Sequence, residues 1–180
     1  LSQAEHGADS QVVLLTDQWE ILESVQKSLK AQLEELPRRE IAEKAMANSR
    51  AILLKDREEL GEMVNAYAPE HLIICHREEA YLLGEIFNAG SVFLGNYTPE
   101  SAGDYASGTN HTLPTNGYAR QYSGVNLDSY TKSMTYQRVD RDGLKRIGPA
   151  VELMANAEGL KAHALAVEIR LNAMEREQEG

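Results

Sequence analysis

The chain begins with two side chains whose types and spacing suit metal or substrate binding, Gln3 and His6. Residues three apart lie on the same face of a helical turn, so an amide oxygen and an imidazole nitrogen can share one ligand here. The spacing alone is more typical of a solvent-facing helix start, and both interpretations stay open.

Pro69, Glu70 and His71 lie at a predicted helix-to-strand junction, where a sheet presents side chains to a crevice. An adjacent carboxylate and imidazole can act there as a general base and its helper. A simple proline-terminated loop accounts for the same three residues without any chemistry, and context has to decide between the two.

A glycine- and serine-rich loop from Ser101 to His111 contains the carboxylate of Asp104. Small residues allow a backbone to approach a ligand closely, and a carboxylate with an imidazole suits zinc or a similar divalent ion. No lysine follows the glycines, so the loop does not match a phosphate-binding P-loop.

Two further pairs of residues are candidates for chemistry. Glu158 and His163 lie five residues apart across a predicted helix start, and His163 is equally explained as a buried core or interface histidine and as a ligand. Cys75 and His76 are strand neighbours that point to opposite faces, so they cannot form a nucleophile–base pair. We expect Cys75 to be a buried structural cysteine and His76 to lie at the surface.

The composition excludes several classes of protein. The 180 residues include 18 basic and 28 acidic side chains, a net charge of −10, which argues against a nucleic-acid partner. Hydrophobic residues make up 42% and charged residues 26%, as in soluble globular domains. No apolar run is long enough to span a membrane. One cysteine and no possible internal disulfide predict a cytoplasmic protein.

Short apolar runs alternate with helical patterns over the first 94 residues. The predicted strands are residues 11–16, 51–54, 72–75 and 91–94. Asp17 with Glu20, and Asp56 with Glu59, predict capping boxes at two helix starts. Gly90 is expected to end a helix that begins near Glu78. This alternation predicts an α/β fold with a parallel sheet.

Residues 95–124 interrupt this alternation and predict a functional loop rather than a linker. A helical pattern returns near Leu127, followed by a β-like piece at 135–139 and helices over 143–156 and 158–175. We therefore divide the chain into an α/β segment, 1–125, and a small, mainly helical segment, 126–180. The first residues carry neither an initiator methionine nor a signal sequence and read like the inside of a helix, so we expect further sequence upstream.

Taken together, these segments resemble one family, the zinc-dependent histidinol dehydrogenases of histidine biosynthesis. The resemblance covers essentially the whole chain and is specific in its order of motifs. Its residues are Leu1–Gly7, Pro69–Leu72, Gly90–Gly95, Ser101–His111, Ala157–Leu160 and Ala162–His163.

The resemblance implies an activity and a set of site residues. The family oxidises L-histidinol to L-histidine in two NAD-dependent steps through histidinaldehyde. The zinc ligands it implies are Gln3, His6 and Asp104, with His163 supplied by the partner subunit of a homodimer. Glu70 and His71 match the acid–base pair. Substrate contacts are implied for these ligands and His71, for His111, and for Glu158 from the partner.

The resemblance also implies what this chain lacks. The segments expected to bind NAD lie upstream, so the chain corresponds to an incomplete Rossmann-like portion and is expected to be inactive in isolation. The alternative is a non-catalytic dimerisation or interaction module that kept the fold. Retention of six polar site residues favours the enzyme: Gln3, His6, Glu70, His71, Asp104 and His163.

Overall fold

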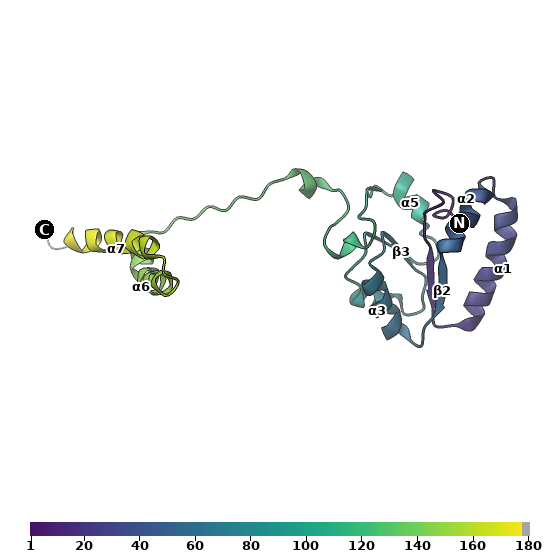
Figure 1. Ribbon diagram of the computed structural model, residues 1–180, viewed down its shortest axis with the longest axis horizontal. Helices are drawn as coiled ribbons and strands as arrows, with labels where there is room; N and C mark the ends of the chain where they lie inside the picture. Colours follow the sequence, from purple (N-terminus) through teal and green to yellow (C-terminus); the bar gives the residue numbers. More distant parts are fainter. Residues whose placement is uncertain (178–180) are drawn as a thin grey trace. The chain divides into compact units, whose positions relative to one another are not determined.

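The computed structural model describes residues 1–177 and divides the chain into two compact units, Leu1–Thr131 and Lys132–Gly180 (Figure 1). The division predicted after residue 125 falls inside the first unit, and the roles assigned to the two predicted segments stay predictions. No helix within residues 1–177 has the length and apolar character needed to cross a membrane.

The first half of unit 1 is a two-stranded parallel sheet with a helical crossover. β1 (Val13–Thr16) pairs with β2 (Arg50–Leu53) in a register that sets Val13 opposite Arg50. Parallel strands need a long connection, which α1 (Trp19–Glu35) and α2 (Arg39–Asn48) supply. Ala4, Ala42 and Ala45 are completely buried in one core cluster, so the amino-terminal turn packs against α2.

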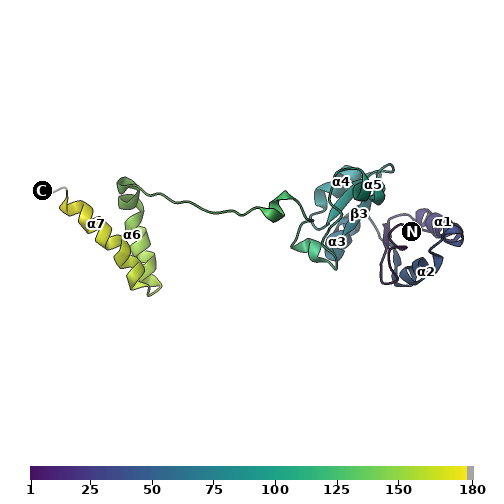
Figure 2. The ribbon, with the colours of Figure 1, turned by 90° about the horizontal axis from the view of Figure 1, so that it is seen from above.

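The second half repeats this arrangement. β3 (His71–Ile74) pairs in parallel with β4 (Ser91–Leu94), and α4 (Glu79–Glu85) lies between them in the chain. α3 (Arg57–Tyr67) connects the two halves and packs on a core of Leu60, Ile74 and Leu82. Figure 2 shows α1 and α2 on one side of unit 1 and α3, α4 and β3 on the other. The predicted parallel α/β class is confirmed, with the strands paired as two separate sheets.

The helix starts test the predicted caps. The Asp56 side chain accepts a hydrogen bond from the Glu59 N–H at 3.0 Å, which confirms the cap of α3. The return bond runs from the Lys55 N–H to Glu59 rather than from Asp56. The predicted cap at Asp17 is wrong: Gln18 precedes α1, and the Asp17 carboxylate has other partners, described below. Gly90 does not end a helix, because α4 ends at Glu85.

The remaining part of unit 1 is less irregular than predicted. α5 (Glu100–Tyr105) and a 3-10 turn at Tyr118–Arg120 interrupt the expected loop over residues 95–124. A second 3-10 turn, Leu127–Tyr130, occupies the region where a helical pattern was expected to return. Six residues containing glycine and serine are too few to show helical periodicity in a sequence, which explains why α5 was not predicted.

Unit 2 is a helical hairpin of α6 (Arg141–Ala157) and α7 (Lys161–Arg176). The two helices confirm the prediction, with ends shifted by a few residues. Gly159 turns the chain between them with a positive φ of 75°. Inside the hairpin, a Cβ on Gly148 would come within 2.9 Å of Leu171, so glycine permits close helix packing. The β-like piece predicted at 135–139 is wrong: these residues are exposed and form no strand.

Candidate active site

His71 and Glu100 form a buried pair where two elements begin. His71 is the first residue of β3 and Glu100 the first of α5, and Nε2 of His71 lies 3.8 Å from Oε1 of Glu100. Only 16% of the His71 side chain and 7% of the Glu100 side chain are exposed. Glutamate is seldom buried without a partner, so this burial marks Glu100 as a functional candidate.

Sequence reasoning missed Glu100. In the sequence, Glu100 follows Pro99 and precedes a run of small residues, a pattern that is equally typical of an ordinary helix start. Its burial depends on contacts with residues about 30 and 100 positions away, His71 and Ser2, whose Oγ donates to Oε2 of Glu100 at 3.4 Å.

The backbone around Glu70 is held closely against β4. The Glu70 carbonyl accepts a hydrogen bond from the Ser91 N–H, and the Pro69 carbonyl accepts one from the Gly90 N–H, both at 2.9 Å. A Cβ on Gly90 would lie only 2.5 Å from the Glu70 oxygen. Glycine at position 90 therefore permits the close approach that sets where Glu70 and His71 enter β3.

Phe93 links His71 to α5. The ring centroids of His71 and Phe93 are 6.0 Å apart, and the planes are tilted by 31°. A Cβ on Gly103 would lie 2.7 Å from the Phe93 ring, so only glycine allows α5 to sit this close to β4. Asp104 follows Gly103 and lies four residues after Glu100, so the two carboxylates share one face of α5.

Gln3 and His6 lie in an amino-terminal turn rather than in an α-helix. The His6 N–H donates to the Gln3 carbonyl at 3.3 Å, Gln3 is half-buried, and His6 is exposed. Ala4, between them, anchors the turn in the core. The Ser2–Glu100 hydrogen bond joins this turn to α5, the helix that carries Asp104.

The donor types of Gln3, His6 and Asp104, two oxygens and one nitrogen, fit a zinc site. Within residues 1–177, no three His, Cys, Asp or Glu side chains gather as a metal cluster. Of the ligands expected in unit 1, only His6 and Asp104 belong to these four residue types, so the expected ligands would not form such a three-residue cluster by themselves. The assignment of these residues as ligands stays a prediction.

The other predicted substrate residues are exposed. His111 lies in the loop after α5, Glu158 follows the last residue of α6, and His163 lies in the first turn of α7. Glu158 and His163 belong to unit 2, and their contribution across a subunit boundary stays a prediction.

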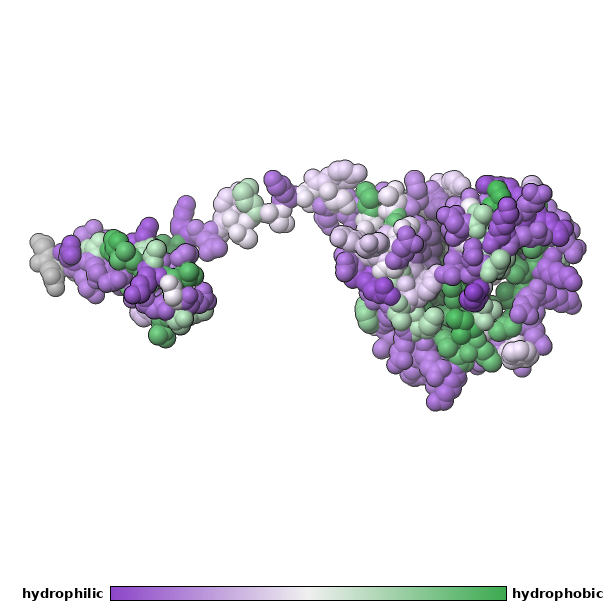
Figure 3. Space-filling view, in the orientation of Figure 1, coloured by the Kyte–Doolittle hydropathy of each residue, from purple (hydrophilic) through white to green (hydrophobic). Residues whose placement is uncertain are grey.

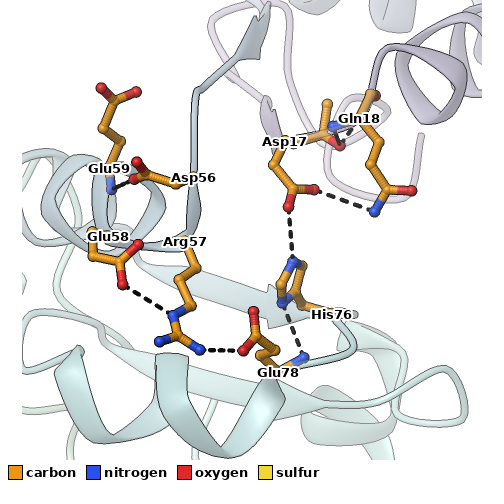
Figure 4. Close-up of polar contacts among 9 residues, drawn as sticks. Asp17, Gln18, Asp56, Arg57, Glu58, Glu59, His76 and Glu78 are labelled. Atoms are coloured by element: carbon orange, nitrogen blue, oxygen red, sulfur yellow. Dashed lines mark hydrogen bonds and ion pairs between the residues drawn. The ribbon is translucent and has the colours of Figure 1, made fainter.

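A second buried histidine joins the carboxyl ends of β1 and β3 (Figure 4). Nε2 of His76 lies 3.5 Å from Oδ2 of Asp17, and Nδ1 of His76 accepts from the Glu78 N–H at 3.1 Å. Burial opposes ionisation of Asp17, but hydrogen bonding from Gln18 and the pairing with His76 outweigh it, so the pKa of this carboxyl lies below its ordinary value.

These contacts correct two predictions. His76 is not a surface residue, because only 13% of its side chain is exposed. Cys75 is exposed rather than buried, and its thiol donates to the Gly95 carbonyl at 3.2 Å. Both differences arise because the strand ends at Ile74, so alternation along the strand no longer applies to the residues that follow.

Comparison with known proteins shows the family of the chain. A family model described as histidinol dehydrogenase matches residues 1–171. Histidinol dehydrogenase from Bacteroides fragilis is 56% identical over 176 residues, covering 98% of this chain and 41% of the relative. The chloroplastic histidinol dehydrogenase of Arabidopsis thaliana is 51% identical, covering 99% of this chain and 38% of the relative.

A crystal structure of histidinol dehydrogenase from Elizabethkingia anophelis matches with a TM-score of 0.91 and 54% identity, covering 97% of this chain and 40% of that one. The chain spans about two fifths of the length of these relatives. It belongs to the histidinol dehydrogenase family.

Proposed function

We propose that this chain is the part of a cytoplasmic, homodimeric histidinol dehydrogenase that carries its proton-transferring and zinc-binding residues. By the full-length enzyme we mean a protein that contains this sequence and has about the length of the relatives. The observation that supports the proposal most strongly is the buried His71–Glu100 pair, which adjoins Glu70 and is tied through Ser2 to the turn of Gln3 and His6.

The full-length enzyme oxidises L-histidinol to L-histidine through histidinaldehyde. When bound, NAD supplies the hydride acceptor and zinc supplies a positive centre that orients the substrate. His71 accepts the proton of the substrate hydroxyl as the alcohol is oxidised, a role that suits imidazole at neutral pH. Glu70 accepts a proton from the water that adds to the aldehyde carbonyl before the second oxidation.

The zinc ligands in this proposal come from two subunits: Gln3, His6 and Asp104 from one chain, and His163 from its partner. His111 of the same chain and Glu158 of the partner subunit contact the substrate. Exposed apolar side chains on the hairpin support contact with a second copy. They include Leu153, Met154 and Ile169, which are 73%, 64% and 57% exposed.

The strands of unit 1 support the presence of further polypeptide. Leu53 of β2 and Ile73 of β3 are 46% and 50% exposed. Figure 3 shows apolar surface on unit 1. Parallel sheets are normally covered on both faces. We propose that the two small sheets are parts of Rossmann-like domains, completed by segments that also hold NAD. The isolated chain is then inactive.

The test uses the full-length enzyme with L-histidinol and NAD. We expect NADH formation in both oxidation steps, loss of activity on zinc chelation, and recovery when zinc is added back. The 180-residue chain assayed alongside should form no NADH. A folded, zinc-loaded full-length protein that forms no NADH from histidinol would instead support the interaction-module alternative.

A further inference from the structure

We infer that Glu100 is a positioning residue that holds His71 with its proton on Nε2, so that Nδ1 is the nitrogen that accepts the substrate proton. The inference rests on the proposed function for the role of His71. It names Glu100 as the residue that orients His71, Nδ1 as the accepting atom, and Nε2–H as the tautomer of the ring.

The His71 imidazole is enclosed at Nε2. Nε2 of His71 has no access to solvent and no hydrogen-bond partner within ordinary distance. Its nearest charged neighbour is Oε1 of Glu100, at 3.8 Å, and Phe93 lies beside the ring. A buried polar atom left without a partner is costly, so Nε2 must be satisfied from the Glu100 side.

The chemistry of the two facing atoms, Nε2 of His71 and Oε1 of Glu100, selects one tautomer. A neutral imidazole has one N–H and one lone pair. A lone pair on Nε2 would face the lone pairs of a carboxylate oxygen, whereas an N–H on Nε2 can donate to it. The separation is longer than a formed hydrogen bond, as is common for catalytic contacts before substrate binds. Glu100 therefore favours the Nε2–H tautomer, which leaves the lone pair on Nδ1.

Glu100 is itself held in a fixed position. Its second oxygen, Oε2, accepts from Ser2, and α5 is seated against Phe93 through Gly103. A carboxylate held on two sides can fix the orientation and tautomer of an imidazole, as the buried aspartate of a Ser-His-Asp triad does.

The experiment compares Glu100→Gln with the unchanged full-length enzyme. The glutamine amide can donate to Nε2, which moves the proton to Nδ1 and removes the accepting lone pair. We expect kcat to fall by about 10²-fold or more, with the KM for histidinol unchanged. Glu79→Gln is the matched control, because Glu79 is also the first residue of a short helix and makes no ion pair with a histidine. It should keep normal kcat.

Nitrogen NMR of the histidine-labelled enzyme at alkaline pH supplies a readout that a merely structural role would not move. The His71 signal is identified by its loss in His71→Asn. We expect the Nε2–H tautomer in the unchanged enzyme and Nδ1–H in Glu100→Gln. An Nδ1–H tautomer in the unchanged enzyme overturns the inference, as does normal kcat in Glu100→Gln.

The unchanged enzyme decides the tautomer even if Glu100→Gln fails to fold. If the unchanged enzyme shows the Nε2–H tautomer and Glu100→Gln shows Nδ1–H, but the unchanged enzyme forms no NADH from histidinol, the proposed function fails while the positioning by Glu100 stands.

Discussion

Replacing Gly90 with alanine perturbs the backbone contact that sets where Glu70 and His71 enter β3. The added Cβ would lie 2.5 Å from the Glu70 carbonyl oxygen and 3.2 Å from Cδ of Pro114. That oxygen is backbone and already accepts the Ser91 N–H, so it can move only if β3 and β4 separate at their first residues. Gly90 does not have a positive φ, so the close approach, not the backbone conformation, requires glycine.

The size of the effect follows from these contacts. Overpacking costs about 1–3 kcal/mol, and loss of one backbone hydrogen bond adds about 0.5–1.5 kcal/mol. We therefore expect Gly90→Ala to lower the free energy of unfolding by about 2–4 kcal/mol. Gly84→Ala is the matched control: its Cβ would meet nothing within 4 Å, and alanine is favoured over glycine within a helix such as α4 by about 1 kcal/mol.

The assay is urea unfolding of the full-length enzyme and both variants, followed by turnover of histidinol. Gly90→Ala should unfold at lower urea and turn over more slowly, while Gly84→Ala should match or exceed the unchanged enzyme in stability. Equal urea midpoints for Gly90→Ala and the unchanged enzyme would show that the Glu70 carbonyl does not constrain this position.

Four further predictions test the proton-transfer pair, the subunit boundary and the second buried histidine. In the full-length enzyme, His71→Asn should lose roughly 10²–10⁴-fold in turnover, and near-normal turnover would assign the base to another group. Glu70→Gln should slow histidinaldehyde oxidation more than histidinol oxidation. Full-length Asp104→Ala and His163→Ala should each be nearly inactive. Their mixed dimer should contain one intact site and recover about half the activity. Verified heterodimers without activity would show that His163 does not act across the interface. Because the folded-state pKa of Asp17 lies below its ordinary 3.8, its contribution to stability is present above that value and is lost as the pH falls through the folded pKa. The stability gap between the unchanged enzyme and Asp17→Asn, followed by unfolding across pH, should therefore narrow in strong acid, and a gap that stays constant with pH would contradict the pairing.

The α/β class could be predicted because strands and helices leave local signals. Four apolar runs and the cap at Asp56 depend on neighbouring residues only, and the structure confirms them. The cap predicted at Asp17 failed for the opposite reason. A carboxylate before a helix can bond to the helix or to a distant partner, and the distant partner here is His76, 59 positions away in the sequence.

The residues of the candidate site also differ in whether their neighbours in the sequence or distant contacts explain them. Glu70 and His71 stand out as adjacent polar residues at a strand start, and the resemblance supplied roles for them. Glu100 could not be found in this way, since its burial is produced by His71, Ser2 and the seating of α5 against Phe93. Pattern reasoning finds residues whose neighbours in sequence explain them, and it misses a carboxylate whose partners are all long-range contacts.

Anomalous X-ray diffraction at the zinc absorption edge, from crystals of the full-length enzyme, tests most directly the claim that this chain carries the metal-binding and proton-transferring site. We predict one zinc peak per subunit, with Gln3, His6 and Asp104 of one chain and His163 of the partner subunit as ligands at about 2.0–2.2 Å. His71 and Glu70 should face the same cavity. A zinc peak bound by other residues, or full-length subunits in which Gln3, His6 and Asp104 point to separate places, would contradict the account.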